Sequence, residues 1–217
     1  MVQGTPSQAV ALGNMGHFSF LDAGLEKIDR IATAGCFLSL RIRGTTPLVT
    51  LHSYPQAWID QYTENGYVLR DPITTWALTV GGTVRWSAPF LPDPFRIFRK
   101  AAEHGLNFGV SITEGPIGAR TICSFARGDR ELTDAETADV RAIVVDLHER
   151  VQLPRNLDAE QAVILKVLGA PGGVQGVASA LGIGEDAARR RIRQLCDVLI
   201  ARTPDEAVQR SRDYKLI

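Results

Sequence analysis

Four of the aromatic residues and one of the acids between positions 54 and 86 have types and spacings that could bind a small molecule. They are Tyr54, Trp58, Tyr62, Asp71 and Trp86. The first three recur at every fourth position, so on a helix that begins near position 55 their rings would lie along one stripe. Hydroxyl, indole and carboxylate groups can hold a small molecule by directed hydrogen bonds while the rings cover its apolar part. The grouping indicates a small-molecule site, although the same stripe is also the common pattern of a packed core.

The acid in this group would suit a ligand with a polar head and an alkyl tail. Asp71 precedes Pro72, a position where a carboxylate commonly caps a helix, and Thr83–Trp86 has the pattern of a short strand. Each buried methylene of a tail contributes about 0.8 kcal/mol, and a hydrogen bond to a charged group about 1.5–3 kcal/mol. A buried carboxylate without a donor is costly. We therefore expect ligand binding to stabilise the fold.

The spacing of these residues resembles the ligand domain of LuxR-type quorum-sensing regulators. The resemblance rests on Tyr54-Pro55-x-x-Trp58-x-x-x-Tyr62, followed by Asp71-Pro72, Trp86 and Gly109 in Asn107-Phe108-Gly109-Val110. It implies that the ligand is an N-acyl-homoserine lactone and that no cofactor is needed. The implied contacts are Asp71 with the amide N–H, Trp58 with the lactone carbonyl, Tyr54 with the amide carbonyl, Tyr62 and Trp86 as walls of the site, and Ser124 as a further hydroxyl.

Length and composition favour a two-domain protein of the cytoplasm. The chain has 217 residues, of which 45% are hydrophobic, enough for one mid-sized and one small core. Twenty-four basic and 24 acidic residues leave no net charge, so any argument for nucleic-acid binding must be local. Three cysteines in apolar surroundings suggest reduced thiols. We find neither a secretory leader pattern nor a long apolar run, and we expect no membrane contact.

The order of helical and strand patterns predicts an α+β fold, an α-β-α sandwich with an antiparallel sheet. Helices are expected over 18–34, 54–65, 92–104 and 133–151, and strands over 36–43, 46–53, 83–86, 108–113 and 120–126. We assign 1–16 to a flexible N-terminus, 17–151 to the autoinducer-binding domain, 152–157 to a linker and 158–217 to a small all-α domain. Family members commonly pair through the region of the 133–151 helix, so its apolar surface could be a homodimer contact or simply pack on its own sheet.

The closing stretch resembles the helix-turn-helix domain of the same family. Val174–Leu181, the Gly182-Ile183-Gly184 turn and a recognition helix over Glu185–Ala201 follow that pattern. Two departures stand out. Gly176-Val177-Ala178 replaces the family's Glu-Ile-Ala, and Ala187-Ala188 replaces its Thr-Val. Phosphate positioning and sequence specificity on DNA are therefore open to test.

The predicted recognition helix has one apolar and one basic face. Ala188, Ile192, Leu195 and Leu199 form the apolar stripe, and the predicted contacts with double-stranded DNA are Arg189, Arg190 and Arg193. A solvated basic face is the alternative. The protein would then be an ordinary regulator with an altered operator, a weak DNA binder that antagonises or modulates another regulator, or a repressor that releases DNA when occupied.

A catalytic or metal-binding function is not expected. The histidines at 52, 104 and 148 form no metal-ligand spacing, and the sequence has no nucleophile elbow and no phosphate-binding glycine loop. His148 is expected on a solvated face among acids. The sequence thus predicts a homodimeric transcriptional regulator, with a pure ligand-binding or interaction module as the alternative.

Overall fold

The computed structural model describes residues 10–11, 19–44 and 46–217, and it divides into two compact units. The first unit is Met1–Val151 and the second unit is Gln152–Ile217. The expectation of a flexible segment over 1–16 falls largely outside the described residues. Each unit has its own buried core.

The first unit is built on a mixed sheet with the strand order β1-β3-β2-β6-β5-β4. The strands are β1 (Val10–Ala11), β2 (Gly35–Ile42), β3 (Val49–His52), β4 (Thr83–Arg85), β5 (Phe108–Glu114) and β6 (Arg120–Arg127). All described pairs are antiparallel except β1 with β3, which is parallel. The predicted antiparallel sheet is therefore confirmed for the five strands β2–β6, and β1 adds a parallel edge strand that the sequence patterns did not indicate.

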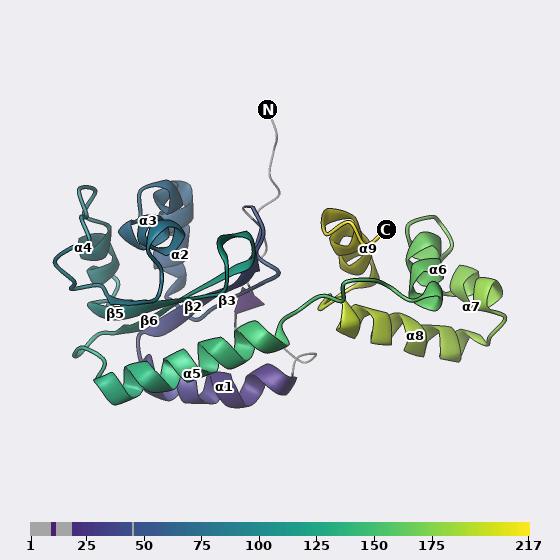
Figure 1. Cartoon of the computed structure of the whole chain (residues 1–217), viewed down its shortest axis with the longest axis horizontal. Helices are drawn as coiled ribbons and strands as arrows, with labels where there is room; N and C mark the ends of the chain where they lie inside the picture. The colour runs from purple at the N-terminus through teal and green to yellow at the C-terminus, as the bar shows by residue number, and fades with distance from the viewer. Residues whose placement is uncertain (1–9, 12–18, 45) are drawn as a thin grey trace. The chain divides into compact units, whose positions relative to one another are not determined.

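Helices cover both faces of this sheet (Figure 1). One face carries α1 (Ser19–Ile31) and α5 (Asp134–Arg150), and the other carries α2 (Gln56–Glu64), α3 (Pro72–Thr79) and α4 (Ile97–Ala102), with the short 3₁₀ helices η2 (Tyr67–Leu69) and η3 (Ile117–Ala119) between elements. This arrangement is the predicted α+β sandwich. Below, the α2–α4 side is called the ligand-side face of the sheet.

Local sequence explains where these helices begin. Thr133 and Glu136 form a complete capping box at the start of α5. The helix predicted over 92–104 is shorter in the structure, because the Asp93 carboxylate accepts the backbone N–H groups of Ile97 and Phe98. The chain therefore turns before α4 begins, and Arg96 adopts a left-handed φ of 55° just ahead of it.

His148 on α5 is buried, so the expectation that it lies on a solvated face is wrong. Its Nδ1 lies 2.8 Å from Thr121 Oγ1, and the Arg41 guanidinium donates to its backbone carbonyl. The ring fits against the sheet because Gly115 has no side chain; a Cβ there would lie 2.4 Å from His148 Cε1. Burial lowers the pKa of His148, and the nearby positive charge of Arg41 lowers it further.

The second unit is a small all-α unit. Its helices are α6 (Ala159–Leu168), α7 (Gly173–Leu181), α8 (Glu185–Val198) and α9 (Pro204–Asp213). The core is apolar and is formed by residues that include Ile164, Leu165, Val177, Ile192 and Leu195. A turn over 182–184 joins α7 to α8, and Gly182 ends α7 with a left-handed φ of 66°. The helix predicted over 185–201 ends at Val198, because Ile200 is left-handed and the Ala201 N–H donates to the Cys196 carbonyl.

The three cysteines are buried free thiols, as predicted. Burial raises the pKa of Cys36 and of Cys196 to about 11, and it raises the pKa of Cys123 further. These thiols are therefore protonated at neutral pH and serve as small apolar side chains. None of the helices in the described part of the chain combines the length and apolar character that a membrane span requires.

Candidate functional site

The predicted aromatic stripe lies on α2 and is turned toward the sheet. Pro55 stands at the N-cap of α2, where its fixed φ suits the start of a helix. Trp58 is buried and Tyr62 is half-buried one turn later, with their ring centroids 5.5 Å apart in an edge-on arrangement. Tyr54 immediately precedes the helix and is also buried. These three residues therefore come together as the sequence predicts.

Asp71 is held between a helix N-terminus and one of these tyrosines. Its Oδ1 accepts the Ile73 N–H at 2.7 Å and so caps α3, and its Oδ2 accepts the Tyr62 hydroxyl at 2.8 Å. Burial raises the pKa of the Asp71 carboxyl, while these two hydrogen bonds oppose the rise. Each carboxylate oxygen still has a further lone pair. The group can therefore accept another N–H without breaking the contacts that position it.

Tyr67 completes an aromatic cluster that the sequence pattern did not single out. We define the aromatic cluster as Tyr54, Trp58, Tyr62 and Tyr67. The Tyr67 ring lies 6.0 Å from Trp58 and 5.8 Å from Tyr62, and the Lys100 ammonium sits 4.6 Å from its centroid. The signal that could have found it is its place only five residues beyond Tyr62, after a glycine that lets the chain turn back.

Trp86 is positioned from the other edge of the sheet. Its ring packs against the same core as the aromatic cluster and stacks on Phe98 at 5.7 Å. The indole Nε1 donates to Ser111 Oγ at 2.9 Å, and Ser111 Oγ lies 2.7 Å from Ser124 Oγ. Gly109 makes this packing possible, since a Cβ there would lie 2.3 Å from two indole carbons. Trp86 and Ser124 are thus linked through Ser111, which sequence reasoning missed.

The register of the strands explains why these groups share one side. Ser124 pairs directly with Ser111 on β5 and with Phe37 on β2, and Phe37 packs against the aromatic cluster. Side chains that pair directly across a sheet point to the same face. Five of the six predicted ligand contacts therefore lie on, or pack against, the ligand-side face, and Asp71 is joined to them by its hydrogen bond from Tyr62. The arrangement combines one carboxylate, several donors and a wide apolar wall.

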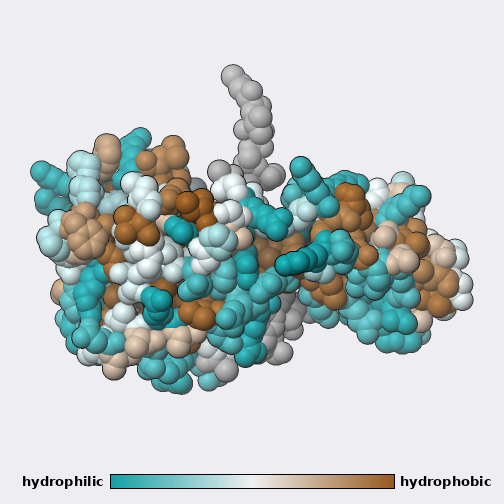
Figure 2. Space-filling model, in the orientation of Figure 1, coloured by the Kyte–Doolittle hydropathy of each residue, from teal (hydrophilic) through white to brown (hydrophobic). Residues whose placement is uncertain are grey.

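The predicted DNA-contacting arginines lie on the exposed side of α8. Ala188, Ile192, Leu195 and Leu199 are buried as the predicted stripe requires. Arg189, Arg190 and Arg193 are exposed, and the surface over α8 is mostly hydrophilic (Figure 2). The Arg189 guanidinium lies 3.6 Å from Glu185 one turn earlier, and Arg191 pairs with Glu160 on α6 at 3.2 Å.

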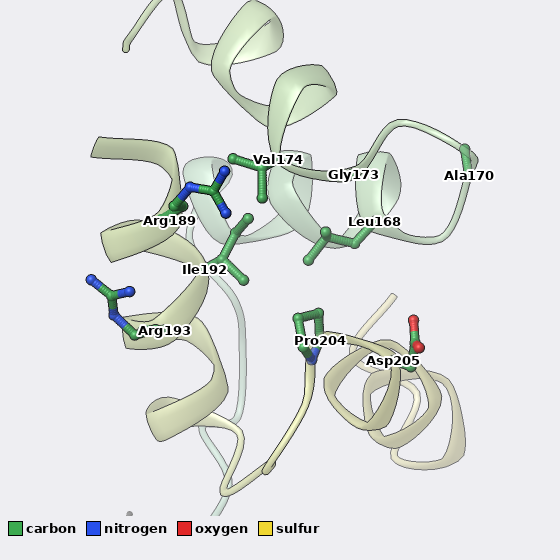
Figure 3. A pocket seen from close by; sticks show the side chains of 9 residues that line it. All are labelled: Leu168, Ala170, Gly173, Val174, Arg189, Ile192, Arg193, Pro204 and Asp205. Atoms are coloured by element: carbon green, nitrogen blue, oxygen red, sulfur yellow. The ribbon is translucent and has the colours of Figure 1, made fainter. Parts of the chain in front are cut away.

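An open hollow of about 490 Å³ lies beside α8 in the second unit. Arg189 and Arg193 stand on its α8 side, Val174 and Leu168 on another, and Pro204 at the start of α9 (Figure 3). The hollow belongs to the second unit, whereas Asp71 and the aromatic cluster belong to the first. Around Asp71 the contacts are between side chains of the first unit, such as Tyr62 with Asp71 and with Trp58. The candidate small-molecule site therefore consists of the polar groups and rings of the first unit and does not include this hollow.

Comparison with known proteins identifies the first unit. The autoinducer binding domain family model matches residues 28–151, which is more than half of the chain. The chain therefore belongs to the autoinducer-binding domain family. The resemblance of this part of the sequence to LuxR-type quorum-sensing regulators is thereby confirmed. A search of curated proteins returned no match.

Solved structures with a similar course of the chain include two of the protein SdiA and one of CepR2. Escherichia coli SdiA has 19% identity over 91% of this chain and 90% of its own, with a TM-score of 0.48. SdiA in complex with octanoyl-rac-glycerol has 18% identity over 88% and 87%, with a TM-score of 0.49. CepR2 from Burkholderia cenocepacia, titled as an N-acylhomoserine lactone dependent LuxR family factor, has 21% identity over 61% and 92%, with a TM-score of 0.43. What these titles say about ligands applies to those proteins, and at this level of similarity it supports no conclusion about this chain.

Proposed function

We propose that this protein is a non-enzymatic, cytoplasmic quorum-sensing transcriptional regulator, a homodimer that binds an N-acyl-homoserine lactone in its first unit. The observation that carries the proposal is the half-buried Asp71 carboxylate, aimed at Tyr62 beside Trp58 and held there by the Ile73 N–H. A carboxylate in this setting suits the amide N–H of a fatty signal, and the surrounding rings suit the acyl chain. In the proposal the Trp58 indole donates a hydrogen bond to the lactone carbonyl, and the Tyr54 hydroxyl donates one to the amide carbonyl. Tyr62, Trp86 and Ser124 complete the site.

Ligand-dependent stabilisation tests this assignment. The thermal melt of the full chain is measured with N-hexanoyl- and N-octanoyl-homoserine lactone and with 1-octanoyl-rac-glycerol, the molecule seen with SdiA. A ligand at 100 times its Kd adds about 2.7 kcal/mol of stability, so a clear rise in Tm is expected with at least one lactone. The glycerol ester serves as the competing ligand class, because it has an acyl chain but no amide N–H for Asp71.

Variants locate the effect. Asp71→Asn is expected to reduce the Tm rise and to weaken binding by roughly tenfold or more, since it removes a charged acceptor and keeps the side-chain shape. Trp58→Phe removes a neutral donor and is expected to weaken binding by at least roughly twofold. Asp60→Asn is the matched control, because Asp60 is exposed on the same helix and bonds only Gln56 among the contacts described. Full response to lactone in Asp71→Asn, or a response to the glycerol ester alone, would refute the assignment.

We further propose that the second unit is a helix-turn-helix domain that binds double-stranded DNA through Arg189, Arg190 and Arg193. Two helices joined by the turn over 182–184, with the apolar side of α8 buried and its basic side exposed, support this. The second unit carries ten basic and eight acidic residues, a formal net charge of +2. Four of these ten basic residues lie on α8.

Gel-shift titration with promoter fragments tests DNA binding. Replacing Arg190 and Arg193 with alanine is expected to abolish the shift while leaving the lactone-induced rise in Tm intact. Each lost phosphate contact lowers the slope of log affinity against log salt by about 0.9. Arg155→Ala, outside α8, is the control. Loss of lactone response in the Arg190 and Arg193 variant would contradict the division of tasks between the two units.

A second candidate function is a ligand-binding partner that modulates another regulator and binds DNA weakly. The observation that favours it is the acidic first turn of α8, where Glu185 pairs with Arg189 and Asp186 adds a further negative charge. Replacing Glu185 and Asp186 with glutamine separates the two functions. A weak shift that becomes strong in this variant would support the second candidate, while an unchanged shift would favour the first.

A further inference from the structure

A row of polar side chains on β3 lies on the ligand-side face of the sheet. Phe37 on β2, which packs against the aromatic cluster, pairs directly with His52, and Ser39 pairs with Thr50. Direct pairs share a face, and so do alternate residues of one strand. Thr50, His52 and Tyr54 are alternate positions, and the Ser53 N–H bond to the Cys36 carbonyl continues the pairing toward Tyr54.

All three of these residues carry a buried polar atom that is unpaired within the described part of the chain. Thr50 Oγ1, His52 Nδ1 and Tyr54 Oη are shielded from solvent and have no hydrogen-bond partner among the residues that the structure describes. The His52 side chain is only 7% exposed. Buried polar groups in native proteins are nearly always paired. Three exceptions within five residues of sequence therefore point to a partner that the described part of the chain does not supply.

The neighbouring polar groups on the same face show the opposite behaviour. Trp86 Nε1, Ser111 Oγ and Ser124 Oγ satisfy one another in a continuous chain. The unpaired atoms are therefore confined to the β3 side of this face. In the proposed function, the Tyr54 hydroxyl donates a hydrogen bond to the amide carbonyl of the ligand. The unpaired polar atoms of Thr50 and His52 are then still without a partner.

We propose that Thr50 and His52 form a second polar subsite, which binds an oxygen substituent on the acyl chain of the ligand. This inference rests on the proposed function, because it assumes that the acyl chain crosses the ligand-side face beyond Tyr54. The preferred ligand is then an acyl-homoserine lactone whose chain carries an oxo or hydroxyl group.

The donor and acceptor chemistry fits this ligand class. Burial lowers the pKa of His52, so the imidazole is neutral, and its Nδ1 can donate or accept according to the tautomer. The Thr50 hydroxyl can do either as well. A ketone accepts from both residues, and a hydroxyl can donate to one and accept from the other. The two Cβ atoms stand roughly 7 Å apart along the strand, so a single oxygen substituent lies within reach of both side chains.

A matched ligand panel tests the subsite on the full chain. Kd is measured for lactones of one chain length whose acyl group is unsubstituted, 3-oxo, 3-hydroxy or hydroxylated at the terminal carbon. Each hydrogen bond is expected to strengthen binding by roughly 2- to 12-fold. The wild type should therefore bind at least one oxygenated lactone more tightly than the unsubstituted one. Comparing the Kd values of the oxo and hydroxy lactones shows which substituent the subsite binds.

Two conservative variants locate the preference. Thr50→Val keeps the side-chain shape and removes the hydroxyl, and His52→Leu removes the imidazole. Each should lower the preference, which is the ratio of the two Kd values, for the oxygenated over the unsubstituted lactone toward unity. Leu51→Met on the same strand, pointing to the opposite face, is the control and should keep the preference. Thr50→Val should also leave the Tm of the empty protein unchanged or raised, because it deletes an unpaired buried hydroxyl.

The outcomes separate the two proposals. Equal affinity of the wild type for all the lactones, or a preference that survives in both variants, overturns the polar subsite and leaves the lactone assignment standing. Absence of binding by every lactone overturns the proposed function and the subsite with it. A preference lost in both variants and kept in Leu51→Met supports the subsite.

Discussion

Replacement of Gly109 with alanine should displace Trp86 and weaken both the fold and the ligand site. A Cβ at this position would lie 2.3 Å from indole Cδ2 and Cε2 and 2.6 Å from Cε3, where about 3.4 Å is the start of ordinary contact. The indole must therefore retreat by roughly 1 Å, as van der Waals packing at core density requires. Such a movement stretches the 2.9 Å bond from Trp86 Nε1 to Ser111 Oγ and disturbs the stacking on Phe98.

The size of the effect follows from these contacts. Overpacking a core costs about 1–3 kcal/mol, and loss of one neutral hydrogen bond about 1 kcal/mol. Gly109→Ala should therefore lower the free energy of unfolding of the first unit by about 2–4 kcal/mol. Urea denaturation followed by circular dichroism and tryptophan fluorescence measures this change, with the two units treated as separate transitions.

A glycine in the same unit provides the control. A Cβ at Gly118 would meet nothing within 4 Å, so Gly118→Ala should change stability by less than about 1 kcal/mol, with the sign toward stabilisation. Adding Trp86→Leu to Gly109→Ala should recover part of the loss, because the smaller side chain leaves room for the new methyl group. A Gly109→Ala protein as stable as the wild type would show that the indole is not confined by the strand beneath it.

Three further predictions follow from single contacts. Lactone affinity should fall as the pH is lowered through the raised pKa of Asp71, because the protonated carboxyl is a weaker acceptor; titration between pH 4.5 and 7 should show this in the wild type and not in Asp71→Asn, and a constant Kd in both would contradict it. Thr133→Ala removes the bond from the Glu136 N–H and should cost about 0.5–2 kcal/mol in urea denaturation, whereas no change would deny the cap a stabilising role. Gly176→Ala places a Cβ 2.9 Å from Val167 Cγ1, so the second unit should lose stability despite a gain of about 1 kcal/mol in helix propensity, and a higher Tm would refute this packing argument.

Features that depend on neighbouring residues were predictable from the sequence. The helix spacing of Tyr54, Trp58 and Tyr62 and the cap formed by Asp71 each involve residues within one or two turns, and the structure places them as expected. The apolar stripe of α8 is likewise a local pattern and is buried. The division of the first unit into a sheet with helices on both faces followed from the alternation of these local patterns.

Features that depend on strand register could not be read from local patterns. The chain from Trp86 through Ser111 to Ser124 joins three segments that are brought together only by the pairing of β4, β5 and β6. Burial of His148 depends in the same way on Gly115 and Thr121 across the sheet. The family resemblance named Trp86 and Ser124, but the serine that connects them carries no signal of its own in the sequence.

The departure at Gly176 shows how the fold can explain an unusual residue. A glycine inside a helix is unfavourable by itself, and from the sequence it suggested only a weakened helix. In the structure a Cβ at Gly176 would press on the Val167 side chain of α6, as would one at Gly172. The glycines therefore allow α6 and α7 to approach closely. The departure from the family sequence at Gly176 is thus explained by helix packing within the second unit, without reference to DNA.

The contacts of Asp71 determine how a ligand can add to the stability of the first unit. The Tyr62 hydroxyl and the Ile73 N–H already use one lone pair on each oxygen of Asp71, so the protein's own groups hold this carboxylate in place. The unpaired atoms lie instead at Thr50, His52 and Tyr54. A ligand that contacts only Asp71 would therefore gain one charged hydrogen bond. A ligand that also reaches β3 would in addition remove the free-energy cost of buried polar groups that the protein itself leaves unpaired. Discrimination among ligands of equal chain length should consequently arise on β3 more than at the carboxylate.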